Sequence, residues 1–125
     1  MIEQELYNYL RNHAPLTTAL GSAEKIFFVI APQGTEFDYV VINKITGGRL
    51  RKVGFGSPLF QVSYFSRSNF RALEGAEILI AALDNHRSKW GTMLVIGNYQ
   101  NDRIFVEDEN IFHAPVEVQI NYLEV

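Results

Sequence analysis

The hydrophobic period changes within the stretch Leu59–His86, and this change constrains the fold more than any other feature of the sequence. In its first half, Gln61 and Ser63 separate apolar residues with a period of two, which predicts a strand with one buried face: Phe60, Val62 and Tyr64. In its second half, apolar residues recur at steps of three and four, as along one face of a helix: Phe70, Leu73, Ala76, Ile80 and Leu83. Ser68 or Asn69 is placed to cap the first helical turn. The chain is therefore expected to hold a strand that leads directly into a helix.

A second helix is expected at the start of the chain. Apolar residues fall at helical spacing over residues 2–13, and Glu3 and Glu5 favour the positive first turn of such a helix. Pro15 ends or kinks it. Gly21 suits the left-handed position just past a further short turn, Leu16–Leu20.

Further runs of the sequence have strand character. Lys25–Ile30 and Tyr39–Ile45 are rich in β-branched and aromatic residues, and we expect them to pair as antiparallel neighbours. Thr92–Tyr99 resumes strand character after the helix, and Asn101-Asp102 predicts a tight hairpin into residues 103–106. Val116–Tyr122 alternates cleanly, as in a half-exposed strand antiparallel to the central one. Together these patterns predict an α+β fold, with a mostly antiparallel sheet of about five or six strands and two helices packed on one face.

The size and composition fit a single globular domain over residues 1–125, because 47% of the residues are hydrophobic and 20% are charged. The absence of cysteine excludes disulfides and thiolate metal sites. No apolar run approaches the roughly 20 residues of a membrane span, and the acidic start Met1–Glu5 lacks the features of a signal peptide. We therefore expect a protein that does not contact a membrane and that is made and kept in a cytoplasm. The net charge of −3 argues against general nucleic-acid binding.

No motif in the sequence indicates a catalytic, cofactor or metal site. The three histidines, His13, His86 and His113, lie far apart and lack a partner at metal-binding helical spacing. The acidic run Glu107–Glu109 lacks the alternating oxygen ligands and glycine of a calcium loop, and no serine stands in a G-x-S-x-G context. We therefore expect no cofactor or metal, and the residues alone predict no more than a soluble α+β domain. A small hydrolase that uses histidines gathered by the fold is the enzymatic alternative.

The segment Lys44–Pro58 is the most unusual part of the chain, because it combines glycines and basic residues with no acid: Gly47, Gly48, Gly54 and Gly56 with Lys44, Arg49, Arg51 and Lys52. A phosphate-binding loop is disfavoured, since no Gly-Lys-Ser/Thr follows. Two interpretations remain open. One is a solvated hairpin with Gly47-Gly48 as its turn, and the other is a loop that becomes ordered against a partner.

Charge is distributed unevenly along the chain. The segment Asp102–Val125 is acidic, with Arg103 as its single base, whereas the segment Lys44–Pro58 is purely basic. These opposite charges could be satisfied within one copy, or the basic segment of one copy could dock on the acidic end of the next. A head-to-tail contact of the second kind gives a ring when it closes. Under this hypothesis the interface residues are Arg49, Arg51 and Lys52 on one side and Glu107, Asp108 and Glu109 on the other.

Several segments, in order, resemble the tail-completion or head–tail joining family of long-tailed phages and prophages, and they span nearly the whole chain. They are the helix that ends in Ala19-Leu20-Gly21; Ile26-Phe27 followed by Ala31-Pro32-Gln33-Gly34 and Tyr39-Val40-Val41; Phe60-Gln61-Val62-Ser63-Tyr64 leading into Arg71-Ala72-Leu73 and Ala81-Ala82-Leu83-Asp84; and Val116–Tyr122. The chain departs from the family pattern at Asp38, where a proline is expected before the tyrosine, and in its basic glycine-rich segment.

This resemblance implies a structural, non-enzymatic part of a virion, made in the cytoplasm of a bacterial host. Members of the family form rings, typically hexamers, at the head-proximal end of the tail tube, where they complete the tube and join it to the head. The implied partners are further copies of the chain, the tail tube protein and head connector proteins, and DNA passes through the ring without specific binding. The non-enzymatic alternative is a cytoplasmic dimeric binding module.

Overall fold

The computed structural model describes residues 1–46, 55–102, 105–108 and 110–124. Within these ranges the helices are α1 (Ile2–Arg11), α2 (Ala14–Leu20), α3 (Asn69–Leu83) and a short 3₁₀ helix, Ala23–Lys25. The strands are β1 (Ile26–Phe28), β2 (Tyr39–Thr46), β3 (Phe55–Gly56), β4 (Leu59–Ser66), β5 (Arg87–Trp90), β6 (Met93–Asp102), β7 (Phe105–Asp108) and β8 (Ile111–Glu124). The predicted α+β class is confirmed, with more strands than expected and a third α-helix.

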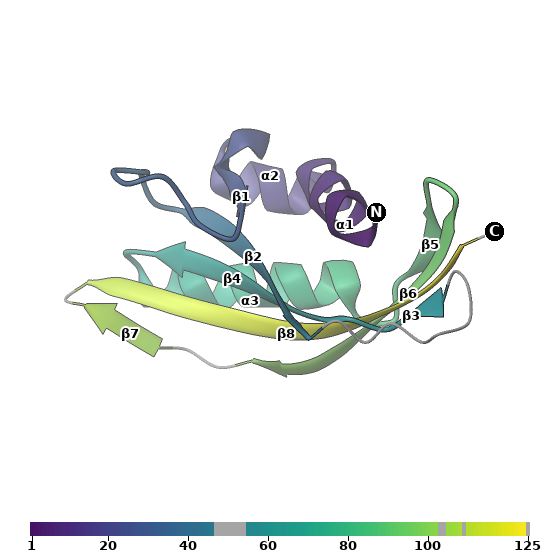
Figure 1. Ribbon diagram of the computed structural model, residues 1–125. Helices are drawn as coiled ribbons and strands as arrows, with labels where there is room; N and C mark the ends of the chain where they lie inside the picture. The colour runs from purple at the N-terminus through teal and green to yellow at the C-terminus, as the bar shows by residue number, and fades with distance from the viewer. Residues whose placement is uncertain (47–54, 103–104, 109, 125) are drawn as a thin grey trace.

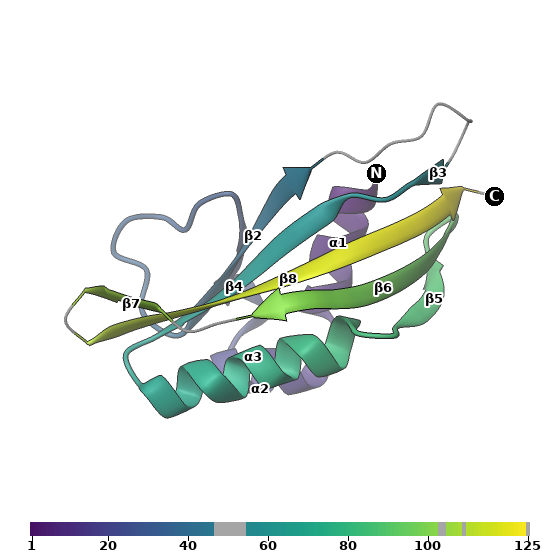
Figure 2. The same cartoon turned by 90° about the horizontal axis from the view of Figure 1, so that it is seen from below.

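The described strands form one eight-stranded sheet whose main path runs β1-β2-β4-β8-β6-β5, while β3 and β7 also pair with β8. Every pairing is antiparallel except that of β1 with β2. The sheet is a curved layer with α1 and α2 above it (Figure 1), and the long strand β8, in yellow, lies between β4 and β6 (Figure 2). Strand β8 therefore joins the two halves of the sheet.

The helices share one face of the sheet, because their buried side chains belong to the same core as the inward residues of β2, β4 and β8. Facing pairs on β4 and β8 build the centre of this core: Phe60 with Val118, Val62 with Val116, and Tyr64 with Ala114. The intervening side chains lie on the opposite, outer face of the sheet. The predicted half-exposed strand over residues 116–122 is thus confirmed, and it extends further in both directions.

The N-terminal prediction is also confirmed. Helix α1 buries Ile2, Leu6 and Leu10 on one face and carries Glu3 and Glu5 in its first turn. A new helix, α2, starts around Pro15, where the proline needs no backbone N–H. It ends at Gly21, whose φ of 83° lies in the left-handed region.

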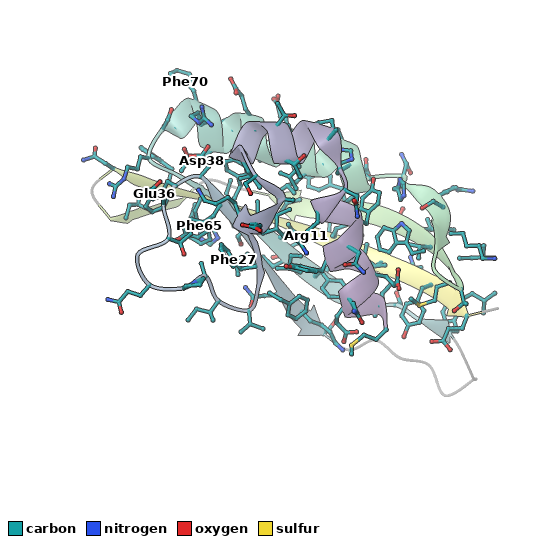
Figure 3. All side chains as sticks on the ribbon, turned by 90° about the horizontal axis from the view of Figure 1, so that it is seen from above. Arg11, Phe27, Glu36, Asp38, Phe65 and Phe70 are labelled. Carbon is teal, nitrogen blue, oxygen red and sulfur yellow. The ribbon has the colours of Figure 1, made fainter. Side chains whose placement is uncertain are left out.

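Helix α3 begins as predicted, because the Ser68 hydroxyl accepts a hydrogen bond from the Arg71 N–H at 3.4 Å. The face that it buries differs from the prediction. Phe70 is 76% exposed and points away from the molecule (Figure 3), and Leu73 is also exposed. The buried face consists mainly of small residues, so the helix lies close to the sheet: Ala72, Gly75, Ala76, Leu79, Ala82 and Leu83.

The prediction that the strand within Lys25–Ile30 pairs antiparallel with the one within Tyr39–Ile45 is wrong. Strands β1 and β2 are parallel, with Ile26 beside Val40. The sequence Ala31-Pro32-Gln33-Gly34 marks no tight hairpin; instead residues 29–38 loop back, so that β2 starts beside the start of β1. Strand β1 therefore lies at one edge of the sheet, next to α1 and the loop.

The tight hairpin predicted at Asn101-Asp102 is also wrong. Both residues belong to β6, where they pair with Glu117 and Val116 of β8. Strand β7 pairs with β8 rather than with β6, so β6 and β7 lie end to end along the same partner. In the part of the chain that the structure describes, no helix has the length and apolar character needed to cross a membrane.

Candidate interaction surface

The segment Phe28–Pro32, hereafter the edge segment, is the most exposed apolar stretch on the β1 side of the sheet. Val29 is 62% exposed and Ile30 is 76% exposed. Strand β1 ends here because Val29 has a φ of 75°, a left-handed conformation that a β-branched residue rarely adopts. The Ile30 N–H then donates to the Phe28 carbonyl at 3.0 Å. These two features turn the chain out of the sheet and direct apolar side chains to solvent.

A groove of about 450 Å³ runs between α1 and the edge segment. Met1 and Tyr7 of the N-terminal region line one wall, and Phe28, Ile30 and Pro32 line the other. Glu3 lies in the same groove and pairs with Lys44 at 3.0 Å. Burial is the largest single influence on the pKa of Glu3 and raises it, but the hydrogen bond to Lys44, a backbone hydrogen bond and the nearby positive charges together lower the pKa below its usual value. The groove is thus apolar with a charged rim.

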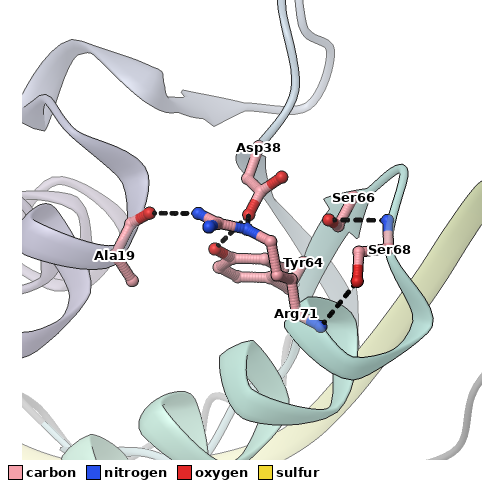
Figure 4. Close-up of polar contacts among 6 residues, drawn as sticks. All are labelled: Ala19, Asp38, Tyr64, Ser66, Ser68 and Arg71. Atoms are coloured by element: carbon pink, nitrogen blue, oxygen red, sulfur yellow. Dashed lines mark hydrogen bonds and ion pairs between the residues drawn. The ribbon is translucent and has the colours of Figure 1, made fainter.

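A buried carboxylate holds the other end of the loop that contains the edge segment (Figure 4). Asp38 is 8% exposed, and its Oδ2 accepts hydrogen bonds at 2.8 Å from both the Tyr64 hydroxyl and Arg71 Nε. Arg71 also donates to the carbonyl of Ala19 at 3.0 Å. The network therefore ties the start of β2 to β4, α3 and α2. The peptide bond between Phe37 and Asp38 is cis, at the position where the family resemblance leads us to expect a proline.

The electrostatics of this network indicate a structural role. Burial raises the pKa of Tyr64, and the neighbouring Asp38 carboxylate raises it further. The hydrogen bond to Asp38 raises the pKa of Arg71. Tyr64 therefore keeps its proton and Arg71 keeps its charge at physiological pH, so neither group is poised for acid–base catalysis.

A row of rings on the outer face supports the same loop. The Phe37 and Tyr39 centroids are 5.1 Å apart, those of Tyr39 and Phe65 are 5.0 Å apart, and those of Phe65 and His113 are 4.3 Å apart. The Arg67 guanidinium lies 4.9 Å from the Phe37 ring centroid, as in a cation–π contact. The loop is thus anchored on both faces of the sheet, and the edge segment projects between the anchors.

A second apolar surface lies at the opposite edge of the sheet. A groove of about 520 Å³, hereafter the outer groove, is bounded by apolar side chains of β3, β6 and β8 and by two cations of β5: Phe55, Leu94, Ile96, Leu123, Arg87 and Lys89. Strand β5 was not predicted from the sequence, because Arg-Ser-Lys-Trp is too short and too polar to show a period. The chain therefore presents apolar surface at both edges of its sheet.

The interface residues predicted from charge belong to the segment Lys44–Pro58 and to the acidic run Glu107–Glu109. Arg49, Arg51, Lys52 and Glu109 lie outside the described residues. Glu107 and Asp108 belong to β7, whose backbone pairs with β8. Contact between the basic segment and the acidic end of a second copy stays a prediction.

The fold brings two of the three histidines together around Tyr9. The Tyr9 ring centroid is 4.6 Å from that of His86 and 5.8 Å from that of His13. The Tyr9 hydroxyl donates to the Ala82 carbonyl at 2.6 Å, and His86 Nε2 lies 2.7 Å from the Ser88 hydroxyl. Burial lowers the pKa of both histidines, and the proximity of His13 lowers that of His86 further.

Among the described residues, no carboxylate forms a hydrogen bond with this histidine cluster. His13 shares a shallow groove with Glu74 and Glu77, but it forms no hydrogen bond with either among the described residues. Those residues also include no group of three metal-ligating side chains. His113 lies apart, on β8 beside Phe65. The cluster is therefore best explained as packing between α1, the end of α3 and β5.

The edge segment was missed because residues 25–30 were interpreted as one continuous strand. The sequence does hold a signal, since Val29 and Ile30 continue the apolar run without alternation and Pro32 follows closely. The sequence holds no such signal for the outer groove. It forms from residues of β3, the hairpin of β5 and β6, and β8, and only the pairing of these strands brings its residues together.

Comparison with known proteins gives matches at the level of fold. No family model and no curated protein matches the sequence. A solved structure described as the virion of a native gene transfer agent particle contains a chain that matches with a TM-score of 0.72 and 15% identity, covering 94% of this chain and 90% of that one. A second solved structure, of a protein known by a sequence identifier alone, matches with a TM-score of 0.61 and 16% identity, covering 92% of this chain and 89% of that one. The present chain and a chain of the gene transfer agent virion therefore share one fold over nearly their whole lengths.

Proposed function

We propose that this protein is a structural component of a phage-like virion, which completes the tail tube and joins it to the head connector as a ring. The observation that carries the proposal is the fold match to a chain of the gene transfer agent virion, with a TM-score of 0.72 over 94% of this chain. The order of motifs in the sequence resembles the tail-completion family independently of that match. Sequence and fold thus support the same class of protein.

The distribution of exposed apolar side chains supports a role in assembly with other protein chains. Exposed apolar patches on soluble proteins commonly mark contacts with other proteins, and this chain carries one at each edge of its sheet. Patches on opposite edges suit a head-to-tail contact, which forms a ring when its rotation closes. We propose a hexamer, in keeping with the family resemblance.

The charge of the chain is compatible with a channel for DNA. With a net charge of −3, a ring of several copies would be acidic as a whole, and like charge lets DNA slide without being held. We therefore propose that DNA passes through the ring without specific binding, and that the tail tube protein and head connector proteins contact its two faces.

Deletion of the gene from the phage or prophage that encodes it tests this function directly. Electron microscopy of the lysate is expected to show DNA-filled heads separate from tails, and a plasmid copy should restore joined particles. Joined, infectious particles after deletion would refute the proposal. Light scattering of the purified protein supplies a second readout, because a hexamer has about six times the 14.3 kDa mass of the chain, whereas a compact dimer favours the binding-module alternative.

A further inference from the structure

We propose that the edge segment of one copy docks into the outer groove of a second copy, and that Glu36 of the first pairs with Arg87 and Lys89 of the second. This inference rests on the proposed function, because it names the surfaces by which neighbouring subunits of the ring meet. Three independent features of the described residues support it: matching apolar character, complementary charge and position at opposite edges of the sheet.

The apolar match is the first feature. The edge segment presents Val29 and Ile30 as protruding, exposed side chains. The outer groove offers Leu94, Ile96 and Leu123, which are also exposed although they are apolar. Contact between the edge segment and the outer groove would bury apolar surface of both. Burial of apolar surface is the main favourable term in association.

Charge complementarity is the second feature. Residues 29–37 contain one charged side chain, Glu36, which lies on the loop near Asp38 (Figure 3). Strand β5 carries Arg87 and Lys89 and no acid. None of these three side chains forms an ion pair with another described residue. Cations on an edge strand can serve merely to block unwanted strand pairing, but these two border an apolar groove and so also select an acidic partner.

Position is the third feature. Strands β1 and β5 end the main path of the sheet, so the edge segment of one chain lies far from its own outer groove (Figures 1 and 2). Each surface therefore needs a second molecule. The contact uses side chains and not strand addition, because Val29 turns the chain away and the Phe28 carbonyl already accepts a hydrogen bond from Ile30.

Cross-linking can test this contact cleanly, because the native chain has no cysteine. Ile30→Cys and Ile96→Cys proteins are mixed in equal amounts and treated with a short bismaleimide. Phe70→Cys, on α3, is the control. Position 70 is as exposed as position 30 and more exposed than position 96, so a higher yield of the 30–96 product cannot come from exposure. All three positions are exposed, so the variants should fold, and circular dichroism checks this. We expect the 30–96 product to exceed the 30–70 product roughly tenfold, as for a contact that holds the two positions together.

A charge exchange supplies the second test. Glu36→Lys should weaken self-association roughly tenfold, which is about the loss of one close ion pair. Glu36→Lys protein mixed with the Arg87→Glu/Lys89→Glu variant should associate again, because the two charges are exchanged across the same contact. Restored association of this mixture, absent in either variant alone, would support the pairing.

Three results would overturn the inference: predominant 30–30 or 96–96 products, equal 30–96 and 30–70 products, or no rescue by the charge exchange. The outcomes also separate the inference from the proposed function. Assembly of virions that requires the protein but tolerates Ile30→Asp and Ile96→Asp refutes the docking and leaves the function intact. A 30–96 contact in a protein whose deletion leaves virions joined refutes the function and leaves the docking intact.

Discussion

The ring of Tyr64 on β4 lies directly against Gly75 of α3, in the space that a Cβ at position 75 would occupy. The contact sets how closely α3 approaches the sheet, and it places the Tyr64 hydroxyl where it donates to Asp38. Gly75 is thus required by packing and not by backbone conformation.

Replacement of Gly75 by alanine should therefore destabilise the protein, although alanine favours helices by about 1 kcal/mol relative to glycine. Overpacking against the buried Tyr64 ring should cost about 1–3 kcal/mol and exceed that gain. Urea denaturation measures the difference. Glu74→Ala, at the neighbouring exposed position, is the control and should change stability by less than about 0.5 kcal/mol. A more stable Gly75→Ala variant would contradict the close approach.

The ion pair between Asp38 and Arg71 gives a second prediction. Arg71→Met leaves the Asp38 carboxylate buried with only Tyr64 as a side-chain donor, and we expect a loss of about 1–3 kcal/mol. The figure is moderate because the Arg71 side chain is 56% exposed. Adding Asp38→Asn should cost less in the Arg71→Met background than in the native chain. Strict additivity in this double-mutant cycle would show that the pair is not coupled.

The cluster around Tyr9 predicts a dependence of stability on pH. His13 and His86 have lowered pKa values in the folded protein, so they bind fewer protons there than in the unfolded chain, where the pKa is 6.5. Stability should fall as the pH drops below about 6.5 and level off below the folded pKa values. Thermal unfolding at about pH 7.5 and about pH 5.5 measures this loss. The loss should be smaller in a His13→Gln/His86→Gln variant, and an unchanged loss would assign it to other groups.

The left-handed backbone of Val29 predicts that replacement by glycine does not lower the stability of the protein, although such a replacement usually does. A valine in this conformation is strained by about 1–2 kcal/mol, and its exposed side chain contributes little packing. Val29→Gly should therefore be neutral or stabilising by up to about 1 kcal/mol after the added freedom of the unfolded chain is subtracted. Ile30→Gly, one residue further and without a left-handed φ, should lower stability by about 0.5–1 kcal/mol. Chemical denaturation measures the stability of both variants. An equal loss of stability in the two would contradict the strain at Val29.

Charge reversal in the basic segment tests the interface predicted from the sequence. The triple variant Arg49→Glu/Arg51→Glu/Lys52→Glu should block assembly and leave the chain folded, if these cations contact a second copy or a partner. Light scattering and virion assembly report the first effect, and circular dichroism reports the second. Normal assembly would remove the basic segment from the interface and leave the two edges of the sheet as the candidate contacts.

Local signals in the sequence predicted much of the fold. The Ser68 cap, the left-handed Gly21 and the alternation of Val116 to Tyr122 depend on neighbouring residues alone, and each is confirmed. Phe70 shows the limit of periodicity. Helical periodicity shows which residues share a face, but it does not show which face the sheet covers. In α3 the covered face is formed mainly by small residues such as Gly75, which give no hydrophobic signal in the sequence.

Features that depend on distant pairing were not predictable in this way. The parallel register of Ile26 with Val40 follows from a loop that Asp38 anchors through Tyr64 and Arg71. The sequence showed Asp38 only as a departure from a family pattern. The candidate surfaces share this property, because the edge segment needs the turn at Val29 and the outer groove needs four paired strands.

Strand β8 has a consequence for how the chain reaches this fold. It is the last described strand in sequence, yet it alone connects β4 to β6 and also pairs with β3 and β7. A growing chain on the ribosome can form the β2–β4 and β5–β6 pairs, but it leaves two open sheet edges until residues 111–124 emerge. Such unpaired edges are prone to aggregate, and pairing across long sequence separations is slow. The sheet is therefore completed only after residues 111–124 have emerged, which delays the presentation of the outer groove until β8 has paired with β6.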